Sequence, residues 1–268
     1  MRKFDITEYL IKTEKITNIG VGFKFLIISD LHSNDYGINL HEVIGAIRRE
    51  QPDAILLAGD IINRKISENV ITIIKFISAI ARRYKVFYAL GNHEYTLKMN
   101  VEQYGNFYQE YKKMLSDAGV VFLEDETIIL KKNEEQIAIS GLEIDKVFYS
   151  KIPPVMGKGL VDKHLGNVET DIFKLLIAHN PDYFEQYASW GADLVVSGHL
   201  HGGTVRIPKV GGIMGTNLEI LPKYDAGGYR IDNSRMIVSR GLGAHTIPIR
   251  INNRPEMGVV KILAKNSL

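Results

Sequence analysis

Cysteine is absent from the 268-residue chain, which excludes disulfide bonds and thiolate metal sites such as zinc fingers. Any bound metal must therefore use imidazole, carboxylate, amide or water ligands. A strong charge of one sign is also absent, because 33 lysines and arginines face 31 aspartates and glutamates, for a formal net charge of +2. This balance gives no indication of a nucleic-acid partner, which we do not expect, but it permits a small phosphorylated substrate.

Long apolar runs are missing as well. Residues 1–22 alternate charged and apolar side chains and contain no apolar core of the kind found in secretory signals. The longest apolar runs, such as Ala54–Ala58, are far too short to cross a bilayer. We therefore expect a cytoplasmic protein without a transmembrane segment, and we leave peripheral contact with a membrane open.

The first half of the chain alternates strand and helix patterns. Short apolar runs at 24–29, 53–58 and 85–90 predict buried strands, and a further strand is predicted within 4–16. Helical spacing of apolar residues at 40–47, 66–81 and 101–118 separates or follows these runs. This alternation is typical of an α/β fold, in which helices cover a parallel sheet.

The second half contains mostly strands. These are predicted at 128–130, 136–140, 174–178, 193–197, 236–239 and 259–263. One helix is predicted among them, beginning at Asn180-Pro181 and ending near Gly191. A second sheet packed on the first fits this pattern. Without a linker, repeat or low-complexity tract, we expect a single domain over 1–268.

The segment at 148–171 has no clear periodicity and is rich in proline and glycine. It predicts a long irregular insertion. Loops of this length are usually functional or mobile. A surface loop and a lid that faces the substrate remain equally open as interpretations.

Polar clusters follow five of the predicted strands. They are Asp30-Leu31-His32, Gly59-Asp60, Gly91-Asn92-His93-Glu94, Ala178-His179-Asn180-Pro181 and Gly198-His199-Leu200-His201-Gly202-Gly203. Each cluster alone is a weak signal, since Gly-Asp is a common turn and a single histidine can be structural. The carboxyl ends of parallel strands share one edge of a sheet, however, so the five clusters can converge. Buried carboxylates and imidazoles there would need a counter-charge, which predicts a metal site.

In order and spacing, these five motifs resemble the calcineurin-like binuclear metallophosphoesterase family over about residues 24–203. Residues 239–255 are similar to the closing segment of its single-domain bacterial phosphodiesterases. The resemblance implies a four-layer α/β/β/α sandwich of two mixed sheets. It also implies a metal-dependent enzyme that hydrolyses a phosphodiester or a phosphomonoester.

The resemblance further implies the roles of individual residues. Asp30, His32 and His201 would hold one metal, Asn92, His179 and His199 would hold the other, and Asp60 would bridge both. Two cations about 3.5–4 Å apart can share a water, lower its pKa and direct the resulting hydroxide at phosphorus. His93 would contact the phosphate and protonate or stabilise the leaving oxygen. Asp60 and His93 are thus the expected catalytic residues, and Asn92 and His93 the expected substrate-binding residues.

The ligand chemistry limits the choice of metal. Imidazole, carboxylate and amide groups without sulfur suit manganese, which is our first expectation, and also iron, zinc, cobalt or nickel. Calcium is disfavoured because it prefers oxygen ligands. We therefore expect two divalent cations of the first transition series.

The second motif departs from that of the protein phosphatases of this family. Asn63 stands where they have an aspartate that supports the histidine of the third motif. Asn63 could still accept a hydrogen bond there but would add no negative charge. Weaker candidates for substrate contact are His164, Asn217, His245 and Arg250.

Alternative functions remain at this point. The fold could serve as a non-catalytic metal-binding scaffold, although such a protein would be expected to have lost some of these residues. A pyrophosphatase of nucleotide-linked lipid precursors is a further possibility within the same family. The motifs do not choose among substrates, because the loops that read the substrate vary on a shared fold.

Overall fold

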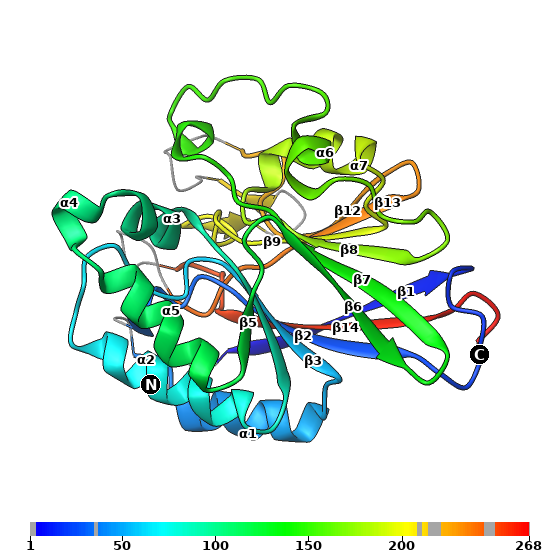
Figure 1. Ribbon diagram of the computed structural model, residues 1–268, viewed down its shortest axis with the longest axis horizontal. Coiled ribbons are helices and arrows are strands. Elements are labelled where there is room, and N and C mark those ends of the chain that lie inside the picture. Colours follow the sequence, from blue (N-terminus) through cyan, green and yellow to red (C-terminus); the bar gives the residue numbers. More distant parts are fainter. Residues whose placement is uncertain (1–3, 35–36, 208–210, 214–220, 244–249, 268) are drawn as a thin grey trace.

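The computed structural model describes residues 4–34, 37–207, 211–213, 221–243 and 250–267. Within these residues, two six-stranded mixed sheets pack face to face, with helices on the outer side of each (Figure 1). The first sheet has the strand order β1 (Asp5–Thr13), β14 (Glu256–Ala264), β2 (Phe23–Ile28), β3 (Ala54–Ala58), β4 (Lys85–Ala89) and β5 (Val120–Phe122). Strands β2 to β5 run parallel, whereas β14 is antiparallel to β2.

The second sheet is also mixed. Its order is β12 (Gly227–Ile231), β13 (Ser234–Val238), β9 (Leu194–Ser197), β8 (Phe173–Ile177), β7 (Glu135–Gly141) and β6 (Glu126–Lys132). The four inner strands are parallel, and the edge strands β12 and β6 are antiparallel to their neighbours. A small ribbon of β10 (Arg206–Ile207) and β11 (Gly211–Gly212) forms a separate sheet.

Helices cover the outer face of each sheet. Helices α1 (Leu40–Glu50), α2 (Asn69–Ala81) and α5 (Phe107–Asp117) pack on the first sheet, and α6 (Leu160–Leu165) and α7 (Phe184–Ser189) on the second (Figure 1). The remaining helices are α3 (Asn92–Met99), α4 (Val101–Tyr104), η1 (His32–Asn34), η2 (Lys146–Tyr149) and η3 (Pro181–Tyr183). The predicted α/β/β/α sandwich of two mixed sheets is confirmed.

Alternation along each strand divides the core into layers. In β2, Phe25 and Ile27 face the space between the sheets, while Leu26 and Ile28 face the helices of the first sheet. This follows from the two-residue period of a strand, because successive side chains point to opposite faces. The fully apolar strands read in the sequence are therefore strands buried on both faces.

Some predicted elements differ from the structure. The single helix expected over 101–118 is divided into α4 and α5, because Gly105 adopts a left-handed φ of 58°. Helix α3 begins within the third motif, and the short strands β5 and β12 were not predicted. None of the helices in the described ranges is long and apolar enough to cross a membrane.

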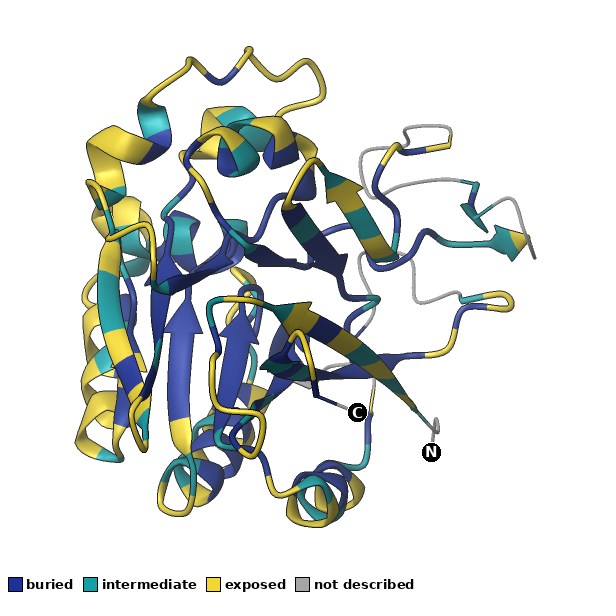
Figure 2. Ribbon diagram, turned by 90° about the vertical axis from the view of Figure 1, so that its right-hand side faces the viewer, coloured by how far each residue is buried: buried dark blue, intermediate teal, exposed yellow. Residues whose placement is uncertain are grey.

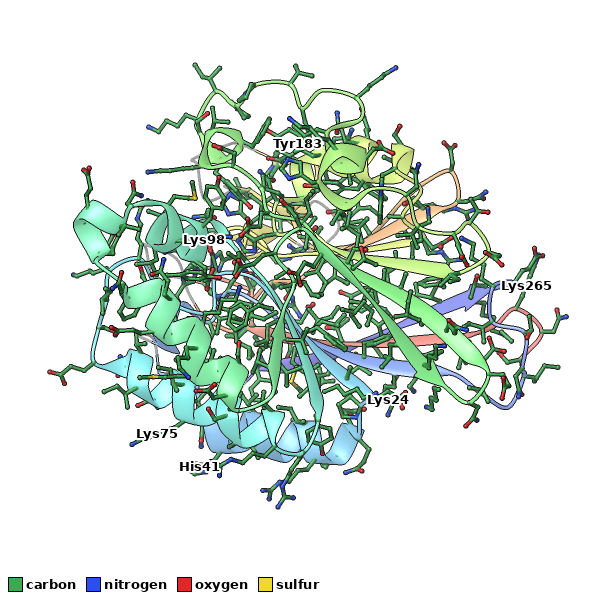
Figure 3. The ribbon with its side chains drawn as sticks, in the orientation of Figure 1. Lys24, His41, Lys75, Lys98, Tyr183 and Lys265 are labelled. Carbon is green, nitrogen blue, oxygen red and sulfur yellow. The ribbon has the colours of Figure 1, made fainter. Side chains whose placement is uncertain are left out.

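The insertion at 148–171 lies over the second sheet and contains the short helix α6, which was not predicted. Its residues are mostly exposed, apart from a few such as Met156 and Val161 (Figure 2). Side chains outside the insertion donate hydrogen bonds to its backbone carbonyl oxygens. The hydroxyl of Tyr183, labelled beneath the loop in Figure 3, donates to the carbonyl oxygens of Phe148 at 3.2 Å and Pro154 at 3.3 Å.

Candidate metal centre

Backbone contacts bring the loops after the parallel strands together. The N–H of Asp30 donates to the carbonyl of Gly59 at 3.0 Å, and the N–H of His32 donates to the carbonyl of Asp60 at 3.0 Å. The loops after β3 and β4 approach still more closely, since a Cβ on Gly91 would lie 2.2 Å from Oδ1 of Asp60. The glycine of the third motif is thus required by the closeness of its neighbour.

Several residues of the site adopt left-handed backbone conformations. Their φ values lie between 47° and 71°, at Asp30, His32, Asp60, His199 and His201. Such conformations cost about 1–3 kcal/mol each for residues other than glycine and are concentrated at functional sites. The fold therefore holds these side chains in positions that the chain would not adopt by itself.

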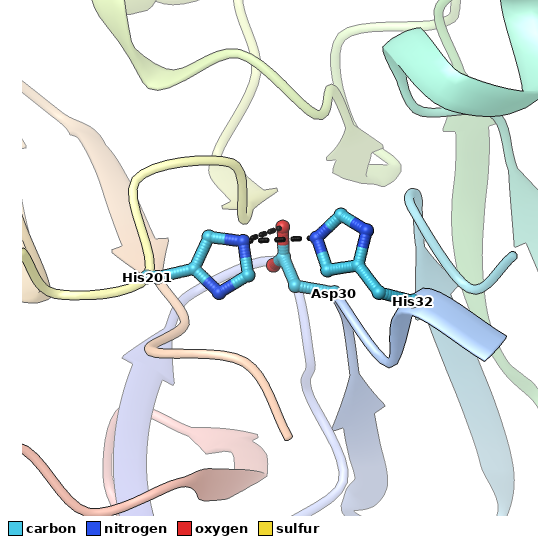
Figure 4. Close-up of side chains that lie close together, drawn as sticks. All are labelled: Asp30, His32 and His201. Atoms are coloured by element: carbon cyan, nitrogen blue, oxygen red, sulfur yellow. Dashed lines mark hydrogen bonds and ion pairs between the residues drawn. The ribbon is translucent and has the colours of Figure 1, made fainter. Parts of the chain in front are cut away.

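The first group of ligand atoms comes from Asp30, His32 and His201. Nε2 of His201 lies 3.0 Å from Nε2 of His32 and 3.4 Å from Oδ1 of Asp30 (Figure 4). All three side chains are buried, and their ligand atoms lie within 4.8 Å of one another. This distance is short enough for one cation to contact all three.

The second group comes from Asp60, His179 and His199, whose ligand atoms also lie within 4.8 Å of one another. Nδ1 of His179 lies 2.7 Å from the carbonyl of Ala58, which can only accept, so Nδ1 carries the proton. The lone pair of neutral His179 is therefore on Nε2, 3.2 Å from Oδ2 of Asp60. This is the arrangement of a metal-binding histidine oriented by a backbone carbonyl.

The two groups adjoin each other. Nε2 of His179 lies 3.8 Å from Oδ1 of Asp30, which belongs to the first group. Oδ1 of Asn92, Oδ2 of Asp30 and Nε2 of His179 are buried and have no hydrogen-bond partner among the described residues. Buried polar atoms are normally paired, and a cation would pair these. With its carboxylate, imidazole and amide ligands, the site fits divalent transition metals.

The buried carboxylates and imidazoles shift one another's pKa. Burial raises the pKa of Asp30 to about 7, although His179 opposes the shift. Burial would lower the pKa of His179, but the carboxylates of Asp60 and Asp30 raise it to about 10. Burial would raise the pKa of Asp60, yet His179 and His93 hold it well below its usual range. Protons and cations thus compete for the same atoms.

Nδ1 of His93 accepts a hydrogen bond, whereas Nδ1 of His179 donates one. The donor to His93 is the backbone N–H of Arg64, at 3.0 Å, so the proton of the neutral His93 ring is on Nε2. That Nε2 lies 3.9 Å from Oδ2 of Asp60, and His93 forms a third ligand group with His32 and Asp60. Since a protonated nitrogen cannot bind a cation, the hydrogen bond favours a donor role over a ligand role.

The side chain of Asn63, which the sequence offered as a partner of His93, makes a contact within its own segment. Its side-chain oxygen accepts a hydrogen bond of 3.0 Å from the N–H of Lys65 in a local turn. The backbone N–H of Arg64 donates to Nδ1 of His93. This main-chain contact was not predicted from the sequence.

Glu94 has a positioning role that the sequence did not predict. Oε2 accepts from the N–H groups of Asp60 at 2.9 Å and Gly91 at 3.0 Å. Oε1 accepts from the N–H of Ile62 at 3.0 Å and the hydroxyl of Tyr88 at 2.8 Å. This buried carboxylate therefore ties the second motif to the third.

Tyr149 is a second residue that the sequence did not indicate. It ends η2 at the start of the insertion, and its ring lies 4.9 Å from the ring of His199 and 6.1 Å from that of His179. Its hydroxyl makes no hydrogen bond within the described ranges, and burial raises its pKa well above the usual value. The insertion therefore reaches the site at its first turn.

The weaker candidates have different positions. Arg250 donates to the carbonyl oxygen of His201 at 3.4 Å, and its Nη2 lies 3.3 Å from Nδ1 of that ring. His164 pairs with Asp125 at 2.5 Å on the surface. Asn217 and His245 lie outside the described residues.

A four-layer α/β/β/α fold with carboxylates and imidazoles gathered at its strand ends defines a class of metal-dependent hydrolases. Residues 23–203 match the family model for calcineurin-like phosphoesterases, and the chain belongs to this family. The resemblance seen in the motifs is thereby confirmed. The chain is a metal-dependent phosphoesterase, and its groups of candidate metal ligands are consistent with this class.

Relatives of similar length support this assignment. The uncharacterized metallophosphoesterase YkuE of Bacillus subtilis is 26% identical over 273 residues, covering 98% of this chain and 86% of the relative. The phosphodiesterase YaeI of Escherichia coli is 26% identical over 244 residues, covering 90% and 82%. The crystal structure of TT1561 of Thermus thermophilus has a TM-score of 0.51 and 11% identity, covering 83% of this chain and 92% of that one. This last similarity concerns the fold.

Proposed function

We propose that the chain hydrolyses a small phosphodiester with two divalent cations. Asp30, His32 and His201 would hold one cation, Asn92, His179 and His199 the other, and Asp60 would bridge the two. The observation that carries the proposal is the pair of adjoining ligand groups, each within 4.8 Å. The preference for a diester over a monoester rests on the phosphodiesterase YaeI, a relative along most of the chain.

When bound, the two cations would supply a deprotonated water as the nucleophile and neutralise the phosphate oxygens. Manganese is our first choice of metal, with iron, zinc, cobalt and nickel as alternatives. Carboxylate, amide and imidazole ligands suit all of these metals.

The protein groups around the phosphate have separate tasks. Nε2–H of His93 would donate to a phosphate oxygen and then to the leaving oxygen, since Arg64 fixes the proton on that nitrogen. Asn92 is the first residue of α3 and directly precedes His93. Its side-chain amide nitrogen would contact the same phosphate. The hydroxyl of Tyr149 would contact the alcohol side of the ester from the insertion, next to His199.

The test is hydrolysis of bis-p-nitrophenyl phosphate and p-nitrophenyl phosphate by metal-stripped protein. Manganese, iron, zinc, cobalt, nickel, magnesium or no metal is added back. We expect no turnover without metal, restoration by manganese, and faster cleavage of the diester. Metal uptake without turnover of any phosphoester, nucleotide-linked lipids included, would favour the alternative of a non-catalytic scaffold. Turnover restricted to nucleotide-linked lipids would favour the pyrophosphatase alternative.

Two further expectations belong to the proposal. We propose one domain over 1–268, because the core between the sheets contains residues of both, such as Ile27 and Leu175. A single unfolding transition by two spectroscopic probes would test this. A small phosphorylated substrate is proposed from the family. No nucleic-acid partner is expected, since the charge balance gives no argument for one, and the cytoplasmic location stays a prediction.

A further inference from the structure

The loop between η2 and α6 presents apolar side chains to solvent. Residues 151–155 are all exposed, and Ile152 and Val155 have exposed fractions of 91% and 89%. The next most exposed large apolar residue in the described ranges is Ile19, at 62%. The loop arches out from the body at the top of Figures 1 and 2. Exposed apolar side chains gathered in this way indicate an interaction surface.

Both ends of the loop are attached to the body. Phe148 and Pro154 accept hydrogen bonds from Tyr183, and the side chain of Met156 is 1% exposed. Because these anchors lie on either side of Ile152, and Pro153 and Pro154 restrict the backbone, the tip is held away from the core.

Lysines surround the apolar tip. Lys146, Lys151 and Lys158 lie within 146–161, where no acidic residue occurs, and Asp145 and Asp162 border this stretch. The rest of the chain is close to charge balance, with a formal net charge of +2 for the whole. The combination of projecting apolar side chains and basic flanks matches an anionic bilayer, in which acyl chains accept the apolar groups and headgroups contact the lysines.

The loop also adjoins the metal centre. Tyr149 precedes Ile152 by only three residues, and its ring lies 4.9 Å from that of His199. The base of the loop is thus placed at the candidate metal centre, while its tip projects from the body.

We propose that the loop of residues 150–159 docks the protein on anionic lipid bilayers, with Ile152 and Val155 inserted between the headgroups. Lys151 and Lys158 contact the anionic headgroups. The interaction is peripheral and reversible, because two apolar side chains and a few lysines give only moderate binding. Binding does not depend on turnover, so it can be tested separately from the proposed hydrolysis.

The experiment is flotation of the full chain with vesicles of equimolar phosphatidylglycerol and phosphatidylcholine, or of phosphatidylcholine alone. We expect binding to the anionic vesicles only, weakened by salt. The double variant Ile152→Ser/Val155→Ser should lose binding. The matched control Ile19→Ser/Ile71→Ser, which alters two exposed isoleucines elsewhere, should bind like the original chain.

The charge contribution is tested with Lys151→Gln/Lys158→Gln. A lysine near an anionic surface strengthens binding about fivefold. The double variant should therefore bind anionic vesicles about 30-fold more weakly than the original chain. The control is Lys75→Gln/Lys131→Gln, with Lys75 on α2 at the opposite end of the molecule from Tyr183 (Figure 3). This control variant should lose much less of its affinity for the vesicles.

Three results would overturn the proposal. The first is no binding of the original chain to anionic vesicles, and the second is unchanged binding of the Ile152→Ser/Val155→Ser variant. The third is a dimer in lipid-free solution, detected by light scattering, that dissociates in this variant while vesicle binding is absent. That outcome would identify a second copy of the chain as the partner of the loop.

Discussion

The metal centre and the insertion meet at Tyr149, yet they are held in place in different ways. In the metal centre, buried side chains are fixed by backbone hydrogen bonds between loops and by left-handed conformations such as those of Asp30 and Asp60. The insertion is attached through a few side-chain hydrogen bonds to its carbonyls, and its tip is exposed. The reactive groups are thus preorganised, while the part expected to face the substrate is more loosely attached.

This comparison predicts a large loss of function for changes in the metal centre and small losses for changes in the insertion. The largest effect is expected for Asp60→Asn. Oδ2 of Asp60 lies 3.2 Å from Nε2 of His179 and 3.9 Å from Nε2 of His93, and its replacement removes the charge that we propose bridges the two cations. Activity on a phosphodiester should fall below detection, with at least one metal equivalent lost in elemental analysis.

The matched control is Asp53→Asn, at the other end of β3, where Asp53 pairs with Lys132. It should keep the activity of the original chain under conditions where it remains folded. Near-normal turnover by Asp60→Asn would contradict the bridging role.

The pH dependence of metal binding is the second prediction. With a pKa of about 7 for Asp30 and about 10 for His179, both groups hold protons below pH 7, and His179 alone holds one above it. Binding of the two cations must displace these protons, so their combined apparent affinity rises with pH, by about a hundredfold per unit below pH 7 and about tenfold above. Competition with a metal indicator at several pH values measures the slope.

A histidine of the insertion provides the control for this slope. His164 pairs with Asp125 near the surface, away from the ligand groups. The variant His164→Gln should show the same slope as the original chain. An affinity independent of pH would refute the protonation scheme of the metal centre.

A smaller loss is expected for Glu94→Gln. Both oxygens of Glu94 accept hydrogen bonds, from three backbone N–H groups and the Tyr88 hydroxyl. A glutamine must turn its own NH2 group toward one of these donors. Because Glu94 orients Asp60 from outside the ligand groups, we expect metal affinity or activity to fall about 10–100-fold.

Excess metal distinguishes a positioning role from a general loss of stability. It should restore much of the activity of Glu94→Gln if the change weakens metal binding. A variant with unchanged metal affinity and unchanged kcat would show that Glu94 has no such role.

The smallest effect is expected for Tyr149→Phe. The ring contact with His199 remains, and only the hydroxyl proposed to contact the ester is lost. A lost hydrogen bond of about 1 kcal/mol lowers kcat/KM about fivefold. Metal content should stay unchanged. Tyr95→Phe, which removes a hydroxyl bonded to Asp145, is the control and should have no effect.

A loss of metal in Tyr149→Phe would contradict the separation of the metal centre from the insertion. It would mean that the insertion helps to build the metal centre. A loss confined to kcat/KM supports a role in substrate contact.

The sheets and the motifs at their ends were readable from the sequence because the physical signals are local. Apolar runs such as 24–29 mark strands buried on both faces, and polar residues directly after them lie at one edge of the sheet. Two sets of side chains lie together at that edge, Asp30 with His32 and His201, and Asp60 with His179 and His199.

Other features depend on contacts that no local pattern reveals. Helix α6 has only six residues, and much of its stability comes from packing on the second sheet. The hydrogen bond from the backbone N–H of Arg64 to His93 does not depend on the residue type and so cannot be predicted from the sequence. Tyr149 lies in an aperiodic segment, so its approach to His199 follows only from the folded position of η2.

The most direct test of the central claim is the metal content of His93→Ala, measured together with its turnover. If His93 is a proton donor and the cations are held by the other residues, the variant keeps two metal equivalents. Its turnover of an ester with an alkoxide leaving group should fall by about 10²–10⁴-fold, and less for p-nitrophenyl esters, which need no proton. Loss of a metal equivalent would make His93 a ligand and contradict the account.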